Sequence, residues 1–175
     1  FGRVGVCAST EGNGMIVRLI RRFLSTVWYL ASLLLVVPCV TAGDVRQPDW
    51  SLEPRDVIEI QLRALQRNDT PTTDAGIAQT WAFSHPDNRQ ITGPLERFAA
   101  MLKGPNYRML LDHRSHQIER VVRTPTMAIF RVRLVAVDGT QVSLKWQVTK
   151  VERGVFAGAW MTIGVSPPLR SRDAI

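Results

Sequence analysis

The sequence has 175 residues, a length that suits a single domain. Its formal net charge of +7 falls to +4 over residues 43–175, which hold 18 of the 22 Lys and Arg and 14 of the 15 Asp and Glu. These charges are scattered, with no basic stripe and no interleaved aromatic residues, so the composition argues against nucleic-acid binding.

The N-terminal region has the layout of a secretory signal peptide. Met15 opens a short basic region, and an uncharged apolar run follows over residues 23–37. The basic region holds Arg18, Arg21 and Arg22. Pro38 ends the run and small residues follow, so we expect cleavage after Ala42, with residues 15–42 as the signal peptide. Residues 1–14 show no periodicity, and we interpret them as a non-native or over-extended N-terminus.

This layout predicts export to a periplasmic, extracellular or thylakoid-lumen-like compartment. The alternative is a membrane anchor through residues 23–37, although this run is shorter than the roughly 20 residues that span a bilayer. After cleavage we expect no stable membrane span. Both cysteines, Cys7 and Cys39, precede the expected cleavage site. The exported part therefore has no disulfide, thiol nucleophile or thiolate metal site.

Three helices are predicted after a flexible lead over residues 43–51. They lie within residues 51–69, 72–83 and 92–105. Pro54 suits the first turn of the first helix, and apolar residues recur behind it at helical spacing. Pro86 stops the second helix. Pro94 opens the third, and Gly104 fits a left-handed cap at its end.

Four strands are predicted after Tyr107, where β-branched residues become frequent. They lie within residues 115–123, 127–137, 141–151 and 158–165. Asp138 and Gly139 form a hairpin turn signal between the second and third strands. In the third strand one face is apolar, with Val142, Leu144, Trp146 and Val148. The polar residues 167–175 form a tail.

Helices followed by antiparallel strands predict an α+β fold. We expect one domain over residues 52–166, in which three N-terminal helices pack on a curved antiparallel sheet of about four strands. This arrangement resembles a cone with a cleft between the helices and the sheet.

Three segments carry a more specific resemblance: FSHPDNRQITGPLERFAAML, LLDHRSH and GAWMTIGV. Together they resemble bacterial and plastid-lineage proteins known as domain of unknown function 4864, over Leu52 to Val165. The order of elements resembles the nuclear-transport-factor-two-like, or cystatin-like, superfold. The family pattern is matched by Phe83, Ser84, Pro86, Asn88, Arg89, Thr92, Gly93, Pro94, Leu95, Glu96, Arg97 and Phe98. His85 departs from it, because a small residue is usual there, and this disfavours a catalytic role. The resemblance implies a fold but no activity.

The segment DHRSH contains the residues best suited to bind a metal. His113 and His116, beside Asp112, would share one face of a helix at this spacing. On a strand the same spacing points them to opposite faces. Because the segment leads into a strand, we expect no metal site, with His113 hydrogen-bonded at the strand entrance and His116 in solvent.

An acid-base pocket is a second hypothesis. Isomerases and cyclases of the resembled superfold use an Asp or a His paired with a Tyr, and Asp112, His113 and Tyr107 are residues of these types. General-base catalysis needs such a group inside the apolar cleft with a shifted pKa. The apolar face of the third strand offers no acid, so we expect no catalytic residue.

The tryptophans are the third feature, because they either line a ligand cavity or fill the space between helices and sheet. The candidate ligand-pocket residues are Trp81, Tyr107, His113, Trp146 and Trp160. No cofactor is expected.

These features favour an exported, non-enzymatic binding or assembly module. Its partner would be an unidentified protein or a small apolar ligand, and pairing of two copies through the sheet is compatible with the architecture. The alternative is a small isomerase or lyase that uses the cleft. A titratable group at the closed end of the cleft would favour the enzyme, and an apolar or solidly packed cleft would favour the module.

Overall fold

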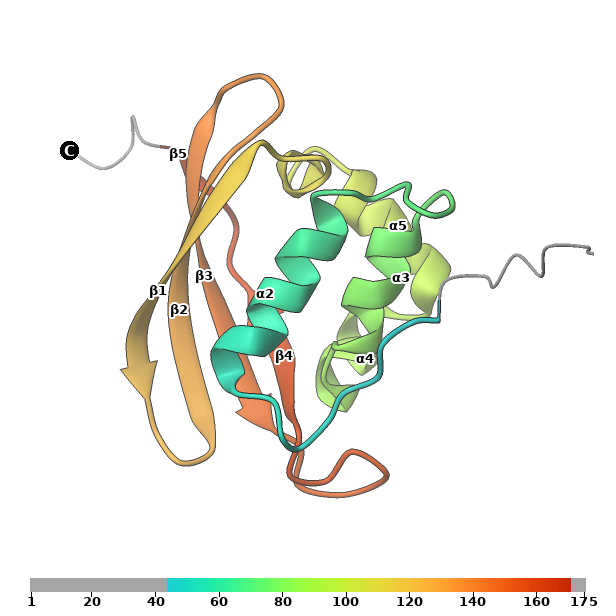
Figure 1. The fold of residues 1–175 in the computed structure, drawn as a ribbon, viewed down its shortest axis with the longest axis vertical. Helices are drawn as coiled ribbons and strands as arrows, with labels where there is room; N and C mark the ends of the chain where they lie inside the picture. The colour runs from blue at the N-terminus through green and yellow to red at the C-terminus, as the bar shows by residue number, and fades with distance from the viewer. Residues whose placement is uncertain (1–43, 171–175) are drawn as a thin grey trace, which may run out of the picture. The chain divides into compact units, whose positions relative to one another are not determined.

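The computed structural model describes residues 44–170, so the predicted signal peptide and the last five residues lie outside the described part. The fold is α+β, as predicted, and all helices precede the strands. The helices are α2 (Pro54–Leu65), α3 (Ala75–Ala82), α4 (Pro86–Thr92), α5 (Leu95–Lys103) and the 3-10 helix η2 (Arg108–Leu110). The strands are β1 (Ser115–Arg123), β2 (Met127–Val135), β3 (Gln141–Lys150), β4 (Trp160–Val165) and β5 (Leu169–Arg170). Figure 1 shows the helices gathered on one face of the sheet.

The amphipathic helix α2 lies against the sheet. Its start is fixed by Pro54 in the first turn and by Asp56, whose carboxylate accepts a hydrogen bond from the Glu53 backbone at 3.1 Å. The buried face repeats at helical spacing and consists of Pro54, Val57, Ile58, Gln61, Leu62 and Leu65. Gln61 is the one side chain of this face that carries hydrogen-bonding groups.

Helix α4 corrects the prediction of three helices, because we expected a loop there. Helix α3 ends at Ala82, and Pro86 occupies the first turn of α4, where no backbone donor is needed. The His85 side chain accepts the Asp87 backbone N–H at 3.2 Å and caps the helix. None of the α4 residues is buried, so the sequence carries no apolar periodicity that would reveal this helix.

Helix α5 begins and ends where the sequence predicts, but its end has a different conformation. Gly104 has φ −71° and ψ 167°, which is extended backbone. The predicted left-handed cap at Gly104 is therefore wrong, and the chain leaves the helix toward Pro105 in an extended conformation.

The sheet is antiparallel in the order β1-β2-β3-β4, and β5 pairs with β3. The predicted hairpin turn is confirmed: Gly139 has φ 86°, and its N–H donates to the Ala136 carbonyl at 2.9 Å. Strand β5 pairs Leu169 with Ser143, so the predicted tail adds a short strand to the sheet.

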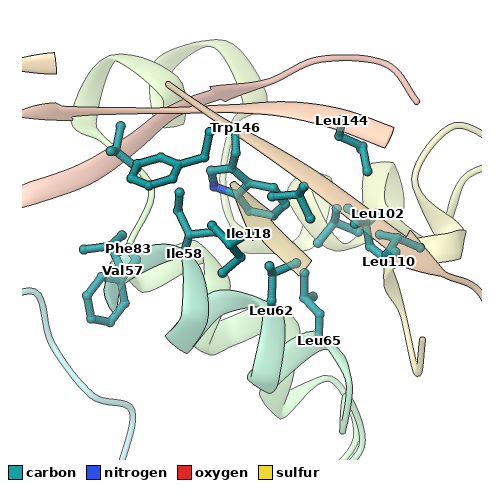
Figure 2. Packing of buried hydrophobic residues seen from close by; sticks show 14 of the residues in the cluster. Val57, Ile58, Leu62, Leu65, Phe83, Leu102, Leu110, Ile118, Leu144 and Trp146 are labelled. Atoms are coloured by element: carbon teal, nitrogen blue, oxygen red, sulfur yellow. The ribbon is translucent and has the colours of Figure 1, made fainter. Parts of the chain in front are cut away.

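The core lies between α2 and the inner face of the sheet. The predicted alternation in β3 is confirmed, because Val142, Leu144, Trp146 and Val148 are all buried. Trp146 is opposite Phe130 of β2. Figure 2 shows the Trp146 ring extending from the sheet toward Ile58 and Leu62 of α2. Among residues 44–170, no helix is both long and apolar enough to cross a membrane.

Candidate functional site

A cavity of about 260 Å³ lies between the helices and the sheet. Its wall is formed by Gln61, Leu65, Thr80, Ser84, Asn88, Ile91, Thr92, Phe98, Met101, Leu102, Tyr107, Leu110, Trp146, Thr162, Ile163, Gly164 and Val165. None of these described lining residues carries a carboxylate, an imidazole, an ammonium or a guanidinium group. The phenol of Tyr107 is the only ionisable group in this wall.

A buried hydrogen-bond network centred on Gln61 forms one side of the cavity. The Gln61 Nε2 donates to the Thr80 carbonyl at 3.0 Å. Its Oε1 accepts from the Thr162 hydroxyl at 2.6 Å and from the Trp146 indole N–H at 3.2 Å. The same indole N–H also lies 3.0 Å from the Thr162 hydroxyl oxygen. The network joins α2, α3, β3 and β4, and its shared bonds hold this wall in one arrangement.

The opening of the cavity lies at α4. Ile91 lines the cavity, yet 74% of its surface is exposed, which places it at the rim. Asn88 also lines the cavity and is tied to β4, because its Nδ2 donates to the Thr162 carbonyl at 3.3 Å. The Thr92 hydroxyl donates to the Asn88 carbonyl at 2.9 Å. The Tyr107 hydroxyl donates to the Val165 carbonyl at 3.2 Å.

The cavity brings together two of the five candidate ligand-pocket residues, Tyr107 and Trp146. Trp81, Trp160 and His113 lie elsewhere. Trp81 is half-buried, and the Arg89 guanidinium carbon lies 4.0 Å from the centre of its ring. Trp160 is buried at the far end of the sheet, with the charged groups of Arg123 and Lys150 at 5.7 and 5.4 Å from its ring.

His113 is fully buried where β1 begins, as predicted, and is hydrogen-bonded at both ring nitrogens. Its Nδ1 lies 2.8 Å from the Leu110 carbonyl, which can only accept, so this nitrogen carries the proton. Its Nε2 then accepts from Nδ1 of His116, also at 2.8 Å. Burial lowers the pKa of His113.

His116 is not in solvent, which corrects the prediction. Only 10% of its side chain is exposed, and its Nε2 lies 3.7 Å from the Glu59 carboxylate of α2. Burial alone would raise the pKa of Glu59, but the hydrogen bond from Arg63 and the charges of His116 and Arg63 outweigh it and lower the pKa. Within residues 44–170, no group of three or more His, Cys, Asp or Glu side chains is arranged to hold a metal.

Two residues of the segment FSHPDNRQITGPLERFAAML, His85 and Arg89, form hydrogen bonds that hold neighbouring elements together. His85 is only 8% exposed, and its backbone N–H donates to the Thr162 carbonyl at 2.8 Å. The Arg89 guanidinium donates to the carbonyls of Trp81 at 3.0 Å and Ala82 at 2.7 Å, which end α3. Burial lowers the pKa of Arg89.

Most residues of the cavity wall were not among the pocket candidates, and these include the polar residues Gln61, Asn88 and Thr162. Gln61 had a recognisable signal, because it is an uncharged polar residue on the buried face of an amphipathic helix. Thr162 likewise interrupts an otherwise apolar short strand. A polar side chain at such a position usually has a buried partner, but the sequence does not name that partner.

Comparison with curated proteins finds no match, and comparison with solved structures finds none. A family profile matches residues 50–166, which is most of the chain and includes every residue of the cavity wall. The family is described as Domain of unknown function (DUF4864). The chain belongs to this family.

Proposed function

We propose that this protein is an exported, non-enzymatic binding module whose cavity holds a small uncharged ligand. The observation that carries the proposal is a cavity walled mainly by apolar side chains, with no charged group in its described lining. Ligand pockets commonly combine an apolar wall with a few placed polar groups.

The polar groups of the wall support binding over catalysis. Proton transfer needs an acid or a base within hydrogen-bond reach of the substrate, and carboxylates and imidazoles are the usual choices. Tyr107 is the only ionisable group in the wall, and its hydroxyl already donates to Val165. The Gln61 side chain is likewise hydrogen-bonded within the protein at both Nε2 and Oε1. These groups can orient a ligand, but they are poorly placed to exchange protons with it.

The size of the cavity limits the ligand. An apolar cavity of about 150 Å³ takes up benzene, so a cavity of about 260 Å³ suits a molecule of one substituted ring or a short branched chain. The exposed Ile91 at the rim adds apolar surface at the entry. The proposal includes the nuclear-transport-factor-two-like superfold, because the order of helices and strands agrees with it.

Export is part of the same proposal and rests on the signal layout of residues 15–42. N-terminal sequencing of the protein from the producing cell is expected to begin at or near Gly43. A mature protein that retains Arg18 to Arg22 would refute cleavage and favour the membrane anchor.

The binding proposal is tested by titrating the protein with toluene and recording amide and indole N–H shifts by NMR. We expect the Trp146 indole signal to move, because this group forms part of the wall. Val165→Phe, which enlarges a side chain opposite Trp146, is expected to abolish the shift. Val155→Phe adds the same ring at a site that is 97% exposed, and it is expected to leave binding unchanged. If toluene shifts the Trp146 indole signal of Val165→Phe as much as that of the parent protein, the proposal is contradicted.

A further inference from the structure

We propose that the cavity selects an uncharged ligand that carries a hydrogen-bond donor, that is, a small alcohol or phenol with an apolar body. This inference rests on the proposed function and concerns the chemistry of the ligand. The polar side chains of the wall leave more hydrogen-bond acceptors than donors free for a ligand.

The hydroxyl hydrogens of the wall are already committed to the protein. Each hydroxyl has one hydrogen and two lone pairs. Tyr107 gives its hydrogen to the Val165 carbonyl at 3.2 Å, and Thr92 gives its hydrogen to the Asn88 carbonyl at 2.9 Å. Ser84 gives its hydrogen to the Thr80 carbonyl at 3.3 Å. These three hydroxyls therefore remain as acceptors.

The amide of Asn88 has the same bias. Its Nδ2 is assigned by the Thr162 carbonyl, 3.3 Å away, because a carbonyl can only accept. The side-chain Oδ1 is then left with no partner among the described residues. An amide oxygen on a half-buried rim residue is a strong acceptor for a group that enters the cavity.

Donors are few by comparison. The indole N–H of Trp146 is shared between Gln61 and Thr162, and the Thr162 hydroxyl hydrogen is held by Gln61. Only the second amide hydrogens of Gln61 and Asn88 are uncommitted. A ligand that brings a donor meets several acceptors, whereas a ligand that brings only acceptors competes for two hydrogens.

The lining also disfavours charged ligands. A carboxylate taken from water into this wall would meet no ammonium or guanidinium group, and an ammonium would meet no carboxylate. Burial of an unpaired charge is strongly unfavourable. An uncharged hydroxyl keeps the apolar contacts and gains one hydrogen bond.

The test compares four ligands of similar size by NMR titration of the parent protein: p-cresol, toluene, p-toluate and 4-methylbenzylammonium. We expect p-cresol to bind about 3- to 10-fold more tightly than toluene, which is the range for one net hydrogen bond. The two ions are expected to bind more weakly than toluene. Equal affinities for p-cresol and toluene, or tightest binding of either ion, would overturn the inference while leaving a binding cavity in place. Failure of both p-cresol and toluene to bind would overturn the proposed function itself.

A pair of variants locates the acceptor. Asn88→Leu removes the rim amide, and we expect the ratio of the p-cresol affinity to the toluene affinity to fall toward one. Gln90→Leu changes an exposed residue of the same helix that does not line the cavity, and it is expected to keep the parent's preference. The ligand series on the parent decides the question even if Asn88→Leu does not fold. A folded Asn88→Leu protein with unchanged preference would exclude Asn88 as the acceptor and contradict this part of the inference.

Discussion

Replacement of Gln61 by Leu should measure how much the buried network contributes to stability. The substitution leaves the Thr162 hydroxyl without its acceptor, while Trp146 keeps its bond to Thr162. It also removes one of the donors to the Thr80 carbonyl, which still accepts from the Ser84 hydroxyl and the Phe83 N–H. A buried group left without a partner costs about 1–3 kcal/mol, and each weakened bond about 0.5–1.5 kcal/mol. The new apolar side chain offsets part of this loss. We therefore expect the free energy of unfolding to fall by about 2–4 kcal/mol.

The matched control is Gln66→Leu, one turn further along. Gln66 makes a single side-chain hydrogen bond, to the Arg114 carbonyl at 2.9 Å, in an exposed setting. Its replacement should cost less than about 1 kcal/mol. Urea denaturation followed by circular dichroism measures both, because a change in midpoint at constant slope is a change in stability. If both variants lose the same free energy of unfolding, the Gln61 network contributes no more to stability than an exposed hydrogen bond.

The remaining predictions concern the core tryptophan and the histidines. Trp146→Ala should lower the free energy of unfolding by about 3–5 kcal/mol or prevent accumulation of the protein. Lys145→Ala, on the exposed face of β3, should change it by less than about 0.5 kcal/mol. Similar losses for the two variants in urea denaturation would contradict the strand register. Thermal denaturation should show a loss of about 1–3 kcal/mol for His113→Ala and about 0.5–2 kcal/mol for His85→Ala, which removes a helix cap. A rise in melting temperature with zinc that His113→Ala abolishes would instead indicate a metal site. The pKa of His113 is lowered by burial, so below its ordinary value of 6.5 the unfolded chain binds a proton that the folded protein does not. Stability should therefore fall as the pH drops below 6.5, by at most about 1.4 kcal/mol per pH unit from this group, and His113→Phe should lack this part of the dependence.

The elements that the sequence predicts are those with strong periodicity. Helix α2 and strand β3 each bury one regular face. The pair Asp138-Gly139 is typical of tight hairpin turns. Helix α4 escapes prediction because it buries no residue and is defined by its caps and its neighbours. The same holds for His85, whose burial depends on β4, more than seventy positions away in the chain.

The cavity is still harder to predict, because residues of all the described helices and of strands β3 and β4 form its wall together. Alternation in β3 shows that Trp146 points inward, but it does not show whether space remains beside the ring. The lack of a charged group in the wall is a property of the assembled surface. His113 shows the same difficulty: its hydrogen bond at the start of β1 was predicted, but it was also a pocket candidate and does not line the cavity.

The separation between His113 and the cavity offers a way to find the ligand. His113 does not line the cavity, and its side-chain hydrogen bonds join it to the backbone carbonyl of Leu110 and to His116. His113→Ala is therefore expected to weaken the fold without removing a side chain of the cavity wall. A ligand present at 100 times its dissociation constant stabilises the folded state by about 2.7 kcal/mol. This is similar to the loss expected from the substitution, so a true ligand should restore the melting temperature of the variant almost to that of the parent. The control is the double variant with Val165→Phe, in which the cavity is filled. A compound that raises the melting temperature of both proteins equally binds elsewhere, and a phenol that behaves in this way would count against the cavity as the binding site.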